Sequence, residues 1–223
     1  RISGYCEEVR VFLRRYYEAA RRTGVVLEGR IPNPDEQNLA YYEEIMGREF
    51  RMEPGFITGS LQKWLPRMNG LQREHVSSAL FDTLTDMRRA GKNDHMLKNA
   101  YIKFMCWLYY KFERIVNRLG EEEVPKILYE GSVSTYELKM LSILAKAGSD
   151  LVLLQQGGDQ EYRKQDPSSA LSCALELPGL SAFPEGFGIR AIRKEMERQW
   201  SRERLYGGAP DISGCTNAWM EGT

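Results

Sequence analysis

The chain contains two short apolar stretches that decide its fold, Val124-Pro-Lys-Ile-Leu-Tyr-Glu-Gly131 and Asp150-Leu-Val-Leu-Leu-Gln155. The first predicts a strand, Lys126–Glu130, between a proline and a glycine. The second is a near-continuous Leu/Val run, which is typical of a strand buried on both faces of a parallel sheet. Between them, Ser134 and Glu137 have the spacing of a capping box at the start of a helix. Strand, helix and strand within about thirty residues predict a βαβ unit.

The ends of these two strands are the candidate ligand site, because open parallel sheets bind ligands beyond the carboxyl ends of their strands. After the first strand, Gly131-Ser-Val-Ser-Thr135 offers hydroxyls and the free amides of a helix N-terminus, which suit a phosphate or a carboxylate. After the second, Gln155-Gln-Gly-Gly-Asp159 offers two glycines for close backbone approach and a carboxylate for a sugar hydroxyl or a metal ion. The candidate ligand-binding residues are Gly131, Ser132, Ser134, Thr135, Gly157, Gly158 and Asp159.

Neither strand end matches the glycine pattern of a dinucleotide-binding turn or of a P-loop. A purely structural role is therefore the alternative: Ser134 would only cap its helix, and Gly157-Gly158 would only turn the chain. The sequence identifies no catalytic residue and no cofactor. Asp159 and Asp166 lack clustered carboxylate partners, so no metal site is assigned.

Residues 1–120 have the pattern of a mainly helical region. A first helix is expected up to Thr23, followed by a short strand at residues 25–27. Longer helices are expected at residues 71–90 and 94–119, where apolar residues recur at helical spacing. Residues 47–70 carry several glycines and prolines and are expected to be mainly loop, with a short helix at residues 61–64.

Residues 121–223 form the second expected region, which is Rossmann-like and contains the βαβ unit. It begins after the acidic stretch Gly120-Glu-Glu-Glu123. Beyond the unit, Asp166 or Ser168 is expected to cap a short helix, and residues 189–204 to form a strongly charged helix. The predicted fold class is therefore mixed α/β, with a largely helical N-terminal half and a Rossmann-like C-terminal half.

The charge of the chain is unevenly distributed although its 31 Lys+Arg balance its 31 Asp+Glu. Residues 1–120 carry a net charge of +5, and residues 121–223 carry −5. The overall balance argues against a general nucleic-acid or membrane binder. The opposite signs predict that the two halves attract each other, with a ligand site at their junction that is faced by basic residues of the helical half.

The composition predicts a reduced, cytoplasmic protein. Its four cysteines are scattered and include no C-x-x-C pair, which argues against a disulfide framework or a zinc site. No signal peptide is visible. The longest apolar run, Phe104-Met-Cys-Trp-Leu-Tyr-Tyr110, is too short for a membrane-spanning helix, which needs about 20 residues.

Several of these stretches together resemble the bacterial YceG-like family. The resemblance is carried by the Val124–Gly131 stretch, Ser134-Thr-Tyr-Glu-Leu138, Asp150-Leu-Val-Leu-Leu154 and Cys215-Thr-Asn-Ala-Trp219, and is best over residues 104–219. Genes of that family lie beside tellurite-resistance (Ter) and toxic-anion-resistance genes. The resemblance therefore implies a component of a bacterial stress-resistance "biosynthetic module". Members of the family are longer than this chain, so it also implies a fragment of a longer protein.

Two functions are compatible with the residues and the resemblance. In the first, the strand ends bind a small anionic ligand such as a nucleotide or a nucleotide sugar. In the second, the protein is a non-catalytic module whose helical half docks a partner of the Ter system, which predicts an exposed apolar patch near residues 104–110. Whether the protein is an enzyme is left open, because the family has no established catalytic residues to carry over.

Overall fold

The protein is a mixed α/β structure built on a three-stranded parallel sheet. The computed structural model describes residues 1–32, 43–45 and 49–206. The strands are β1 (Val25–Glu28), β2 (Lys126–Glu130) and β3 (Asp150–Leu154), and they lie in the order β1-β2-β3. Tyr129 of β2 is in register with Leu27 on one side and Leu153 on the other, so β2 is the central strand.

The predicted βαβ unit is confirmed. Helix α7 (Thr135–Lys146) connects β2 to β3. The first strand has the bounds expected from the sequence, and the second ends at Leu154 rather than at the expected Gln155. Alternate residues of the sheet point to opposite faces. Ile127, Tyr129 and Leu153 join one apolar cluster, whereas Leu128 and Leu154 join another. Both faces are covered, which explains why these strands are almost continuously apolar.

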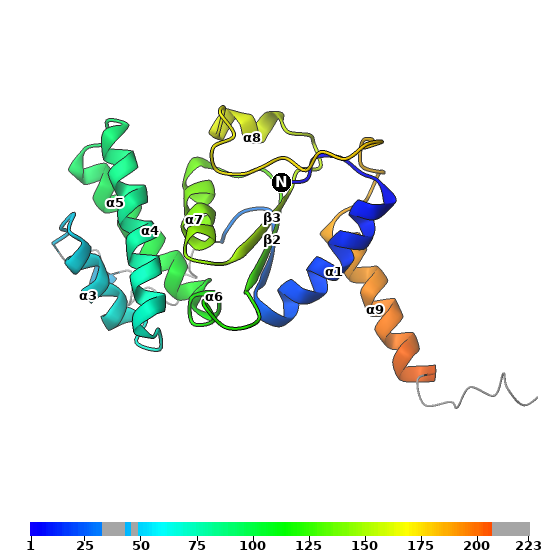
Figure 1. Cartoon of the computed structure of the whole chain (residues 1–223), viewed down its shortest axis with the longest axis horizontal. Coiled ribbons are helices and arrows are strands. Elements are labelled where there is room, and N and C mark those ends of the chain that lie inside the picture. The colour runs from blue at the N-terminus through cyan, green and yellow to red at the C-terminus, as the bar shows by residue number, and fades with distance from the viewer. Residues whose placement is uncertain (33–42, 46–48, 207–223) are drawn as a thin grey trace, which may run out of the picture.

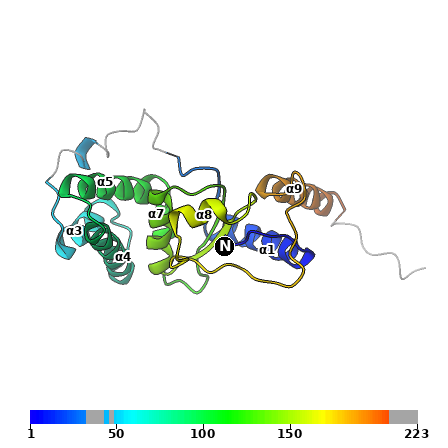
Figure 2. The same cartoon turned by 90° about the horizontal axis from the view of Figure 1, so that it is seen from above.

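Helices form a layer on each face of the sheet (Figures 1 and 2). On one face lie α1 (Glu7–Thr23) and α9 (Ile189–Tyr206), which pack against each other and against the sheet. On the other face lies α7, with a group of further helices behind it. The short helix α8 (Gln160–Gln165) follows β3.

The helices of that group are inserted between two neighbouring strands. The chain leaves the sheet at the end of β1 and returns to it at the start of β2. The intervening helices are α3 (Pro54–Trp64), α4 (Gly70–Arg89), α5 (Asp94–Tyr110) and α6 (Glu113–Val116). Helix α4 contacts both α3 and α7, and thus joins the insertion to the α/β core.

The predicted loop at residues 47–70 is wrong for its central part. Helix α3 spans Pro54–Trp64, with Pro54 at its first position, where proline costs no hydrogen bond. Ile57 and Leu61 lie one turn apart on α3 and are completely buried. Their burial holds the segment in a helix despite Gly55 and Gly59, so tertiary packing outweighs the low helix propensity of glycine.

The predicted helix over residues 94–119 is also wrong at its C-terminal end. Helix α5 ends at Tyr110, and the amides of Lys111 and Phe112 both donate to the Trp107 carbonyl. The chain then turns into α6. With this break, Phe112 and the apolar residues of α6 are buried in the same core as α5.

The short helix expected after Asp166 is replaced by α8, which ends just before that residue. The Asp166 carboxylate is 5% exposed and accepts hydrogen bonds from the Tyr162 hydroxyl (2.8 Å) and the amides of Ala170 (3.0 Å) and Leu171 (2.9 Å). Asp166 thus organises a loop rather than starting a helix. The Cys215–Trp219 motif lies outside the described residues.

The two regions predicted from the sequence contribute to one sheet, because β1 belongs to residues 1–120 and β2 to residues 121–223. A division of the chain near residue 120 stays a prediction about its organisation. Among the described residues, no helix combines the length and apolar composition that crossing a bilayer requires.

Gly24, between α1 and β1, is the tightest point of this arrangement. A Cβ on residue 24 would overlap the backbone of Lys126 in β2. We expect Gly24→Ala to lower the free energy of unfolding by about 3 kcal/mol or more, since backbone on both sides must shift. Urea unfolding followed by circular dichroism measures this loss.

Gly70→Ala is the matched control, because a Cβ at residue 70 meets no atom within 4 Å. We expect it to change stability by less than about 0.5 kcal/mol. Equal effects of the two substitutions would contradict the close approach of Gly24 to β2.

Candidate functional site

A cavity of about 630 Å³ opens at the carboxyl ends of the strands. Its floor is formed by the residues that follow the three strands, and its cover by the loop before α9 and the first turn of that helix. The lining residues are Glu28, Gly29, Glu130, Gly131, Gln156, Phe183, Pro184, Glu185, Gly186, Phe187, Gly188 and Arg190. This is the edge of the sheet at which the sequence predicted a ligand.

Two carboxylates lie on the floor of the cavity. Glu28 ends β1 and Glu130 ends β2, and the two residues are register partners in adjacent strands. Glu28 forms ion pairs with Arg190 (3.2 Å) and Arg193 of α9. The Glu130 carboxylate accepts the Ile189 amide at 2.7 Å, at the N-terminus of α9.

The environment of Glu130 shifts the pKa of its carboxyl group. Burial raises the pKa of its carboxyl group above the ordinary glutamate value, and the hydrogen bond from Ile189 and the charge of Arg190 only partly oppose that effect. A carboxyl group with a raised pKa in a cavity is a feature of many binding and catalytic sites. Glu130 can accept a hydrogen bond when ionised and donate one when protonated.

Glycines let the strand ends approach each other closely. Gly131 has a φ of 130°, and a Cβ there would lie 3.3 Å from the Gly29 backbone. The Gly29 amide donates to the Glu130 carbonyl (2.8 Å), and the Gly131 amide to the Leu154 carbonyl (3.3 Å). Both glycines therefore continue the backbone hydrogen bonding of the sheet to the cavity, where they present no side chain.

Aromatic rings form part of the cover. The rings of Phe183 and Phe187 are stacked, with centroids 5.6 Å apart and planes 9° apart. Tyr5 packs edge-on against Phe187 at 5.0 Å. The loop is also tied to the floor, because the Gln156 side chain donates to the Phe187 carbonyl.

Among the candidate residues at the first strand end, only Gly131 lines the cavity. Ser134 caps α7: its hydroxyl accepts the Glu137 amide (3.4 Å), and the Glu137 carboxylate accepts the Ser134 amide (2.9 Å) and hydroxyl (2.6 Å). The Thr135 hydroxyl donates to Gln165 of α8 (2.6 Å). Ser132 is exposed. A ligand-binding role for these hydroxyls stays a prediction.

The candidate residues after β3 face a different set of partners. Gly158 closes a turn, with its amide donating to the Gln155 carbonyl (3.2 Å), and Gly157 is exposed beside it. Asp159 forms a two-point ion pair with Arg1, at 2.6 Å and 2.8 Å, and a further pair with Arg163 at 3.0 Å. These charges lower the pKa of Asp159 to about 2.

The Arg1 side chain is buried and is fixed by its contacts with Asp159 and Tyr162. Its side chain is 1% exposed, and its guanidinium lies 4.4 Å from the centroid of the Tyr162 ring. Asp159 therefore compensates a buried cation in the structure. No group of three or more His, Cys, Asp or Glu side chains that could hold a metal ion is found within residues 1–32, 43–45 and 49–206.

Sequence reasoning missed the two carboxylates of the cavity and its cationic partner. The signal for the carboxylates is a repeated ending: β1 reads Val25-Val-Leu-Glu-Gly29, and β2 ends with Leu128-Tyr-Glu-Gly131. The expected source of positive charge was the helical half. Of the described cavity residues, the cation is Arg190, which belongs to the acidic second region and not to the helical half.

These features define an α/β protein with a cavity at the carboxyl edge of a parallel sheet, lined by carboxylates, backbone and aromatic rings. Comparison with protein families matches the YceG domain over residues 11–195, so the chain belongs to this family. Searches of curated proteins and of solved structures find no match.

Ser134→Ala tests the capping role of Ser134. We expect it to lower the free energy of unfolding by about 1 kcal/mol, the usual contribution of an N-cap hydroxyl. Ser132→Ala, two residues away and exposed, is the control and is expected to change stability by less than about 0.3 kcal/mol. Equal stability of the two variants in urea unfolding would contradict the capping role.

Asp159→Asn tests the ion pair with Arg1. Because the pKa of Asp159 is lower in the folded protein than the ordinary 3.8, the carboxylate stabilises the fold above about pH 4, and the effect is lost toward pH 2. We expect the variant to be about 2 kcal/mol less stable at pH 7, since a buried guanidinium loses its counter-charge. Urea unfolding between pH 7 and pH 3 measures the difference.

The control is Asp150→Asn, which removes an exposed pair with Lys126 and should cost less than about 1 kcal/mol. A difference between wild type and Asp159→Asn that does not shrink below pH 4 would show that the charge of Asp159 is not the source of its stabilising effect.

Proposed function

We propose that the strand-end cavity binds a small anionic ligand that also carries sugar hydroxyls, such as a nucleotide or a nucleotide sugar. The observation that supports this most directly is the pair of carboxylates, Glu28 and Glu130, at register positions of adjacent strands. Carboxylates at strand ends accept hydrogen bonds from the hydroxyl groups of a ribose or another sugar. The volume of about 630 Å³ is in the range of small-molecule and cofactor sites.

The charges of the cavity favour one orientation of such a ligand. A phosphate beside Glu28 and Glu130 would be repelled, so the hydroxyl-bearing part belongs on the floor. Arg190 stands at the rim with a side chain that is 86% exposed, and its guanidinium can bind a phosphate through two hydrogen bonds. Arg193 would keep Glu28 paired when Arg190 turns to the ligand.

The cover supports the same ligand class. Stacked Phe183 and Phe187 offer an aromatic surface on which a nucleobase or a sugar face can pack. The exposed backbone of Gly29 and Gly131 permits close approach without a side chain in between.

Membership of the YceG domain family is the basis for the proposed biological setting. We propose that the protein acts in the cytoplasm as a component of a Ter-associated module for tellurite and toxic-anion stress resistance. In that setting the ligand is an intermediate or a precursor in the biosynthesis that the module carries out.

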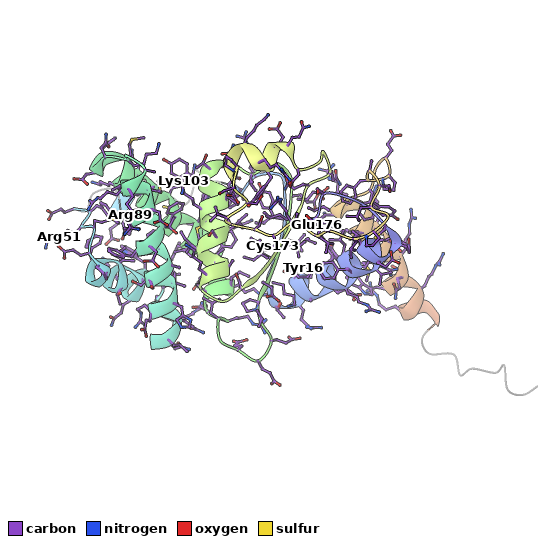
Figure 3. The ribbon with its side chains drawn as sticks, turned by 45° about the horizontal axis from the view of Figure 1, so that its top comes forward. Tyr16, Arg51, Arg89, Lys103, Cys173 and Glu176 are labelled. Carbon is purple, nitrogen blue, oxygen red and sulfur yellow. The ribbon has the colours of Figure 1, made fainter. Side chains whose placement is uncertain are left out.

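A second candidate function is docking of a partner protein, and one surface favours it. Residues 104–110, where the sequence predicted an exposed patch, are instead core: Phe104 and Leu108 are completely buried. An apolar groove of about 430 Å³ lies elsewhere, between α1 and the segment that contains Cys173 and Glu176 (Figure 3). Phe12 and Leu177 line the groove and are 45% and 38% exposed.

A thermal-shift panel of nucleotides, nucleotide sugars and sugar phosphates tests ligand binding. At a ligand concentration of about 100 times Kd, binding adds about 2.7 kcal/mol, so Tm should rise by about 5 °C or more. We expect the rise to disappear in Arg190→Ala and in Glu130→Gln, since each removes one of the two proposed contacts. Arg198→Ala, on the exposed side of the same helix, is the control and should keep it.

If no compound of the panel raises Tm, or if the rise is unchanged in both cavity variants, the ligand proposal is wrong and docking is the better explanation. Circular dichroism of each variant in the absence of ligand checks that its fold is intact.

A further inference from the structure

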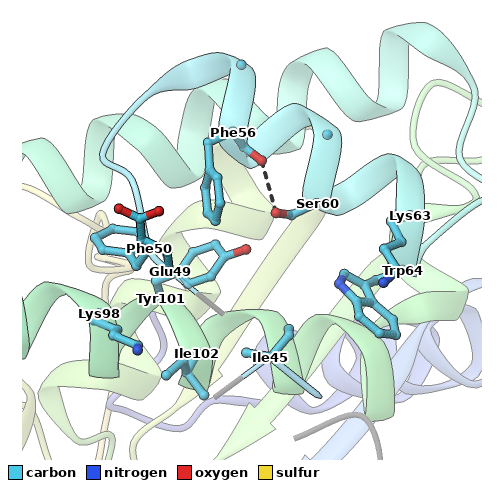
Figure 4. A pocket seen from close by; sticks show the side chains of 12 residues that line it. Ile45, Glu49, Phe50, Phe56, Ser60, Lys63, Trp64, Lys98, Tyr101 and Ile102 are labelled. Carbon is cyan, nitrogen blue, oxygen red and sulfur yellow. Dashed lines mark hydrogen bonds between the residues drawn. The ribbon is translucent and has the colours of Figure 1, made fainter. Parts of the chain in front are cut away.

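The helical insertion contains a second cavity, separate from the strand ends. It has a volume of about 260 Å³ and lies between α3 and α5 (Figure 4). Three rings form one wall: Tyr101 lies 4.9 Å from Phe50 and 5.7 Å from Phe56, centroid to centroid, and Phe50 lies 6.1 Å from Phe56. Trp64 lines the cavity at the other end of α3. The proposed strand-end ligand explains none of these features.

Glycines on α3 keep this cavity open. Gly55 and Gly59 are one helical turn apart, both line the cavity, and a Cβ at either position would meet no atom within 4 Å. A glycine inside a helix weakens it relative to alanine. Neither a left-handed conformation nor a close approach of the described backbone requires Gly59, so its effect on the structure is to leave space beside the rings.

One cation at the cavity lacks a counter-charge among the described residues. Lys63 lies on the Trp64 ring and pairs with Glu44, and Glu49 pairs with Arg51. Lys98 is half-buried and lies beside Tyr101 and Ile102 (Figure 4), and no described side chain forms an ion pair with it. An anionic partner would stabilise the charged form of this half-buried ammonium group.

From these contacts we infer that the cavity binds a flat aromatic molecule of one or two fused rings that carries a carboxylate. The rings of Phe50, Phe56 and Tyr101 offer edges and faces to a flat ring, and Lys98 pairs with the carboxylate. A cavity of about 150 Å³ already holds benzene, so 260 Å³ suits a larger ring system. A single carboxylate matches the Lys98 ammonium group better than a doubly charged phosphate would, given Glu44 and Glu49 nearby.

Isothermal titration calorimetry with three probes, indole-3-acetate, naphthalene-2-carboxylate and 4-hydroxyphenylacetate, tests this site. We expect at least one to bind with a Kd below about 1 mM, while acetate does not bind. Gly59→Leu should abolish binding because its side chain fills the cavity. Since leucine favours a helix more than glycine does, loss of binding in this variant is not a sign of unfolding, which circular dichroism confirms.

Lys98→Gln separates the two parts of the proposed recognition. We expect it to weaken the aromatic carboxylate at least tenfold and to leave the binding of neutral indole within about twofold, whereas Lys92→Gln, on an exposed position away from the cavity, should change neither. The proposal is overturned if none of the three probes binds with a Kd below about 1 mM. It is equally overturned if Gly59→Leu leaves binding intact, or if Lys98→Gln weakens indole as much as its carboxylate. None of these outcomes depends on the strand-end cavity, where Arg190→Ala should have no effect on these probes.

Discussion

The parallel pairing of β1 with β2 is the interaction on which the rest of the structure depends. It joins Leu27 to Tyr129, so the long segment between the two strands must leave the sheet and return to the neighbouring position. The entropy of closing such a loop grows only slowly with its length, and α3 to α6 offset it by burying their apolar faces against one another and, through α4, against α7. The pairing also explains Gly24: α1 must end and β1 begin directly against the backbone of Lys126, where no side chain fits.

The same pairing creates the strand-end cavity. Because β1 and β2 are parallel and in register, Glu28-Gly29 and Glu130-Gly131 lie together at one edge of the sheet. Both carboxylates and the backbone of both glycines line the cavity there. Each carboxylate is then stabilised by α9 in a different way. Glu28 pairs with two arginines of α9, whereas Glu130 accepts the amide at the start of that helix. Charge balance in this cavity is therefore local, which is why the summed charges of the two halves did not identify the arginine that faces it.

The features that could be predicted from the sequence are those that depend on residues close together in the chain. The βαβ unit closely follows its prediction because its capping box, its apolar runs and its glycine stops all lie within about thirty residues of each other. The features that sequence reasoning missed depend on distant partners. Asp159 faces Arg1, and Glu28 faces Arg193, both through contacts that the fold alone creates. Likewise, Gly55 and Gly59 indicated a loop, but Ile57 and Leu61 are buried by other helices and hold the segment as α3.

Glu137 shows how one local signal can serve two purposes. Its buried carboxylate completes the capping box with Ser134, and its other oxygen accepts the Ile31 amide at 2.7 Å. Ile31 lies just where the chain leaves β1 for the insertion, so the start of α7 also fixes the direction of that exit. An internal carboxylate thus takes the place at this helix N-terminus that a ligand phosphate takes in many α/β proteins. A phosphate at the start of α7 would meet the Glu137 carboxylate, whereas a phosphate at the rim of the cavity would meet the guanidinium of Arg190. For the ligand that we propose, this difference favours a charged group near α9 and hydroxyl groups near the strands.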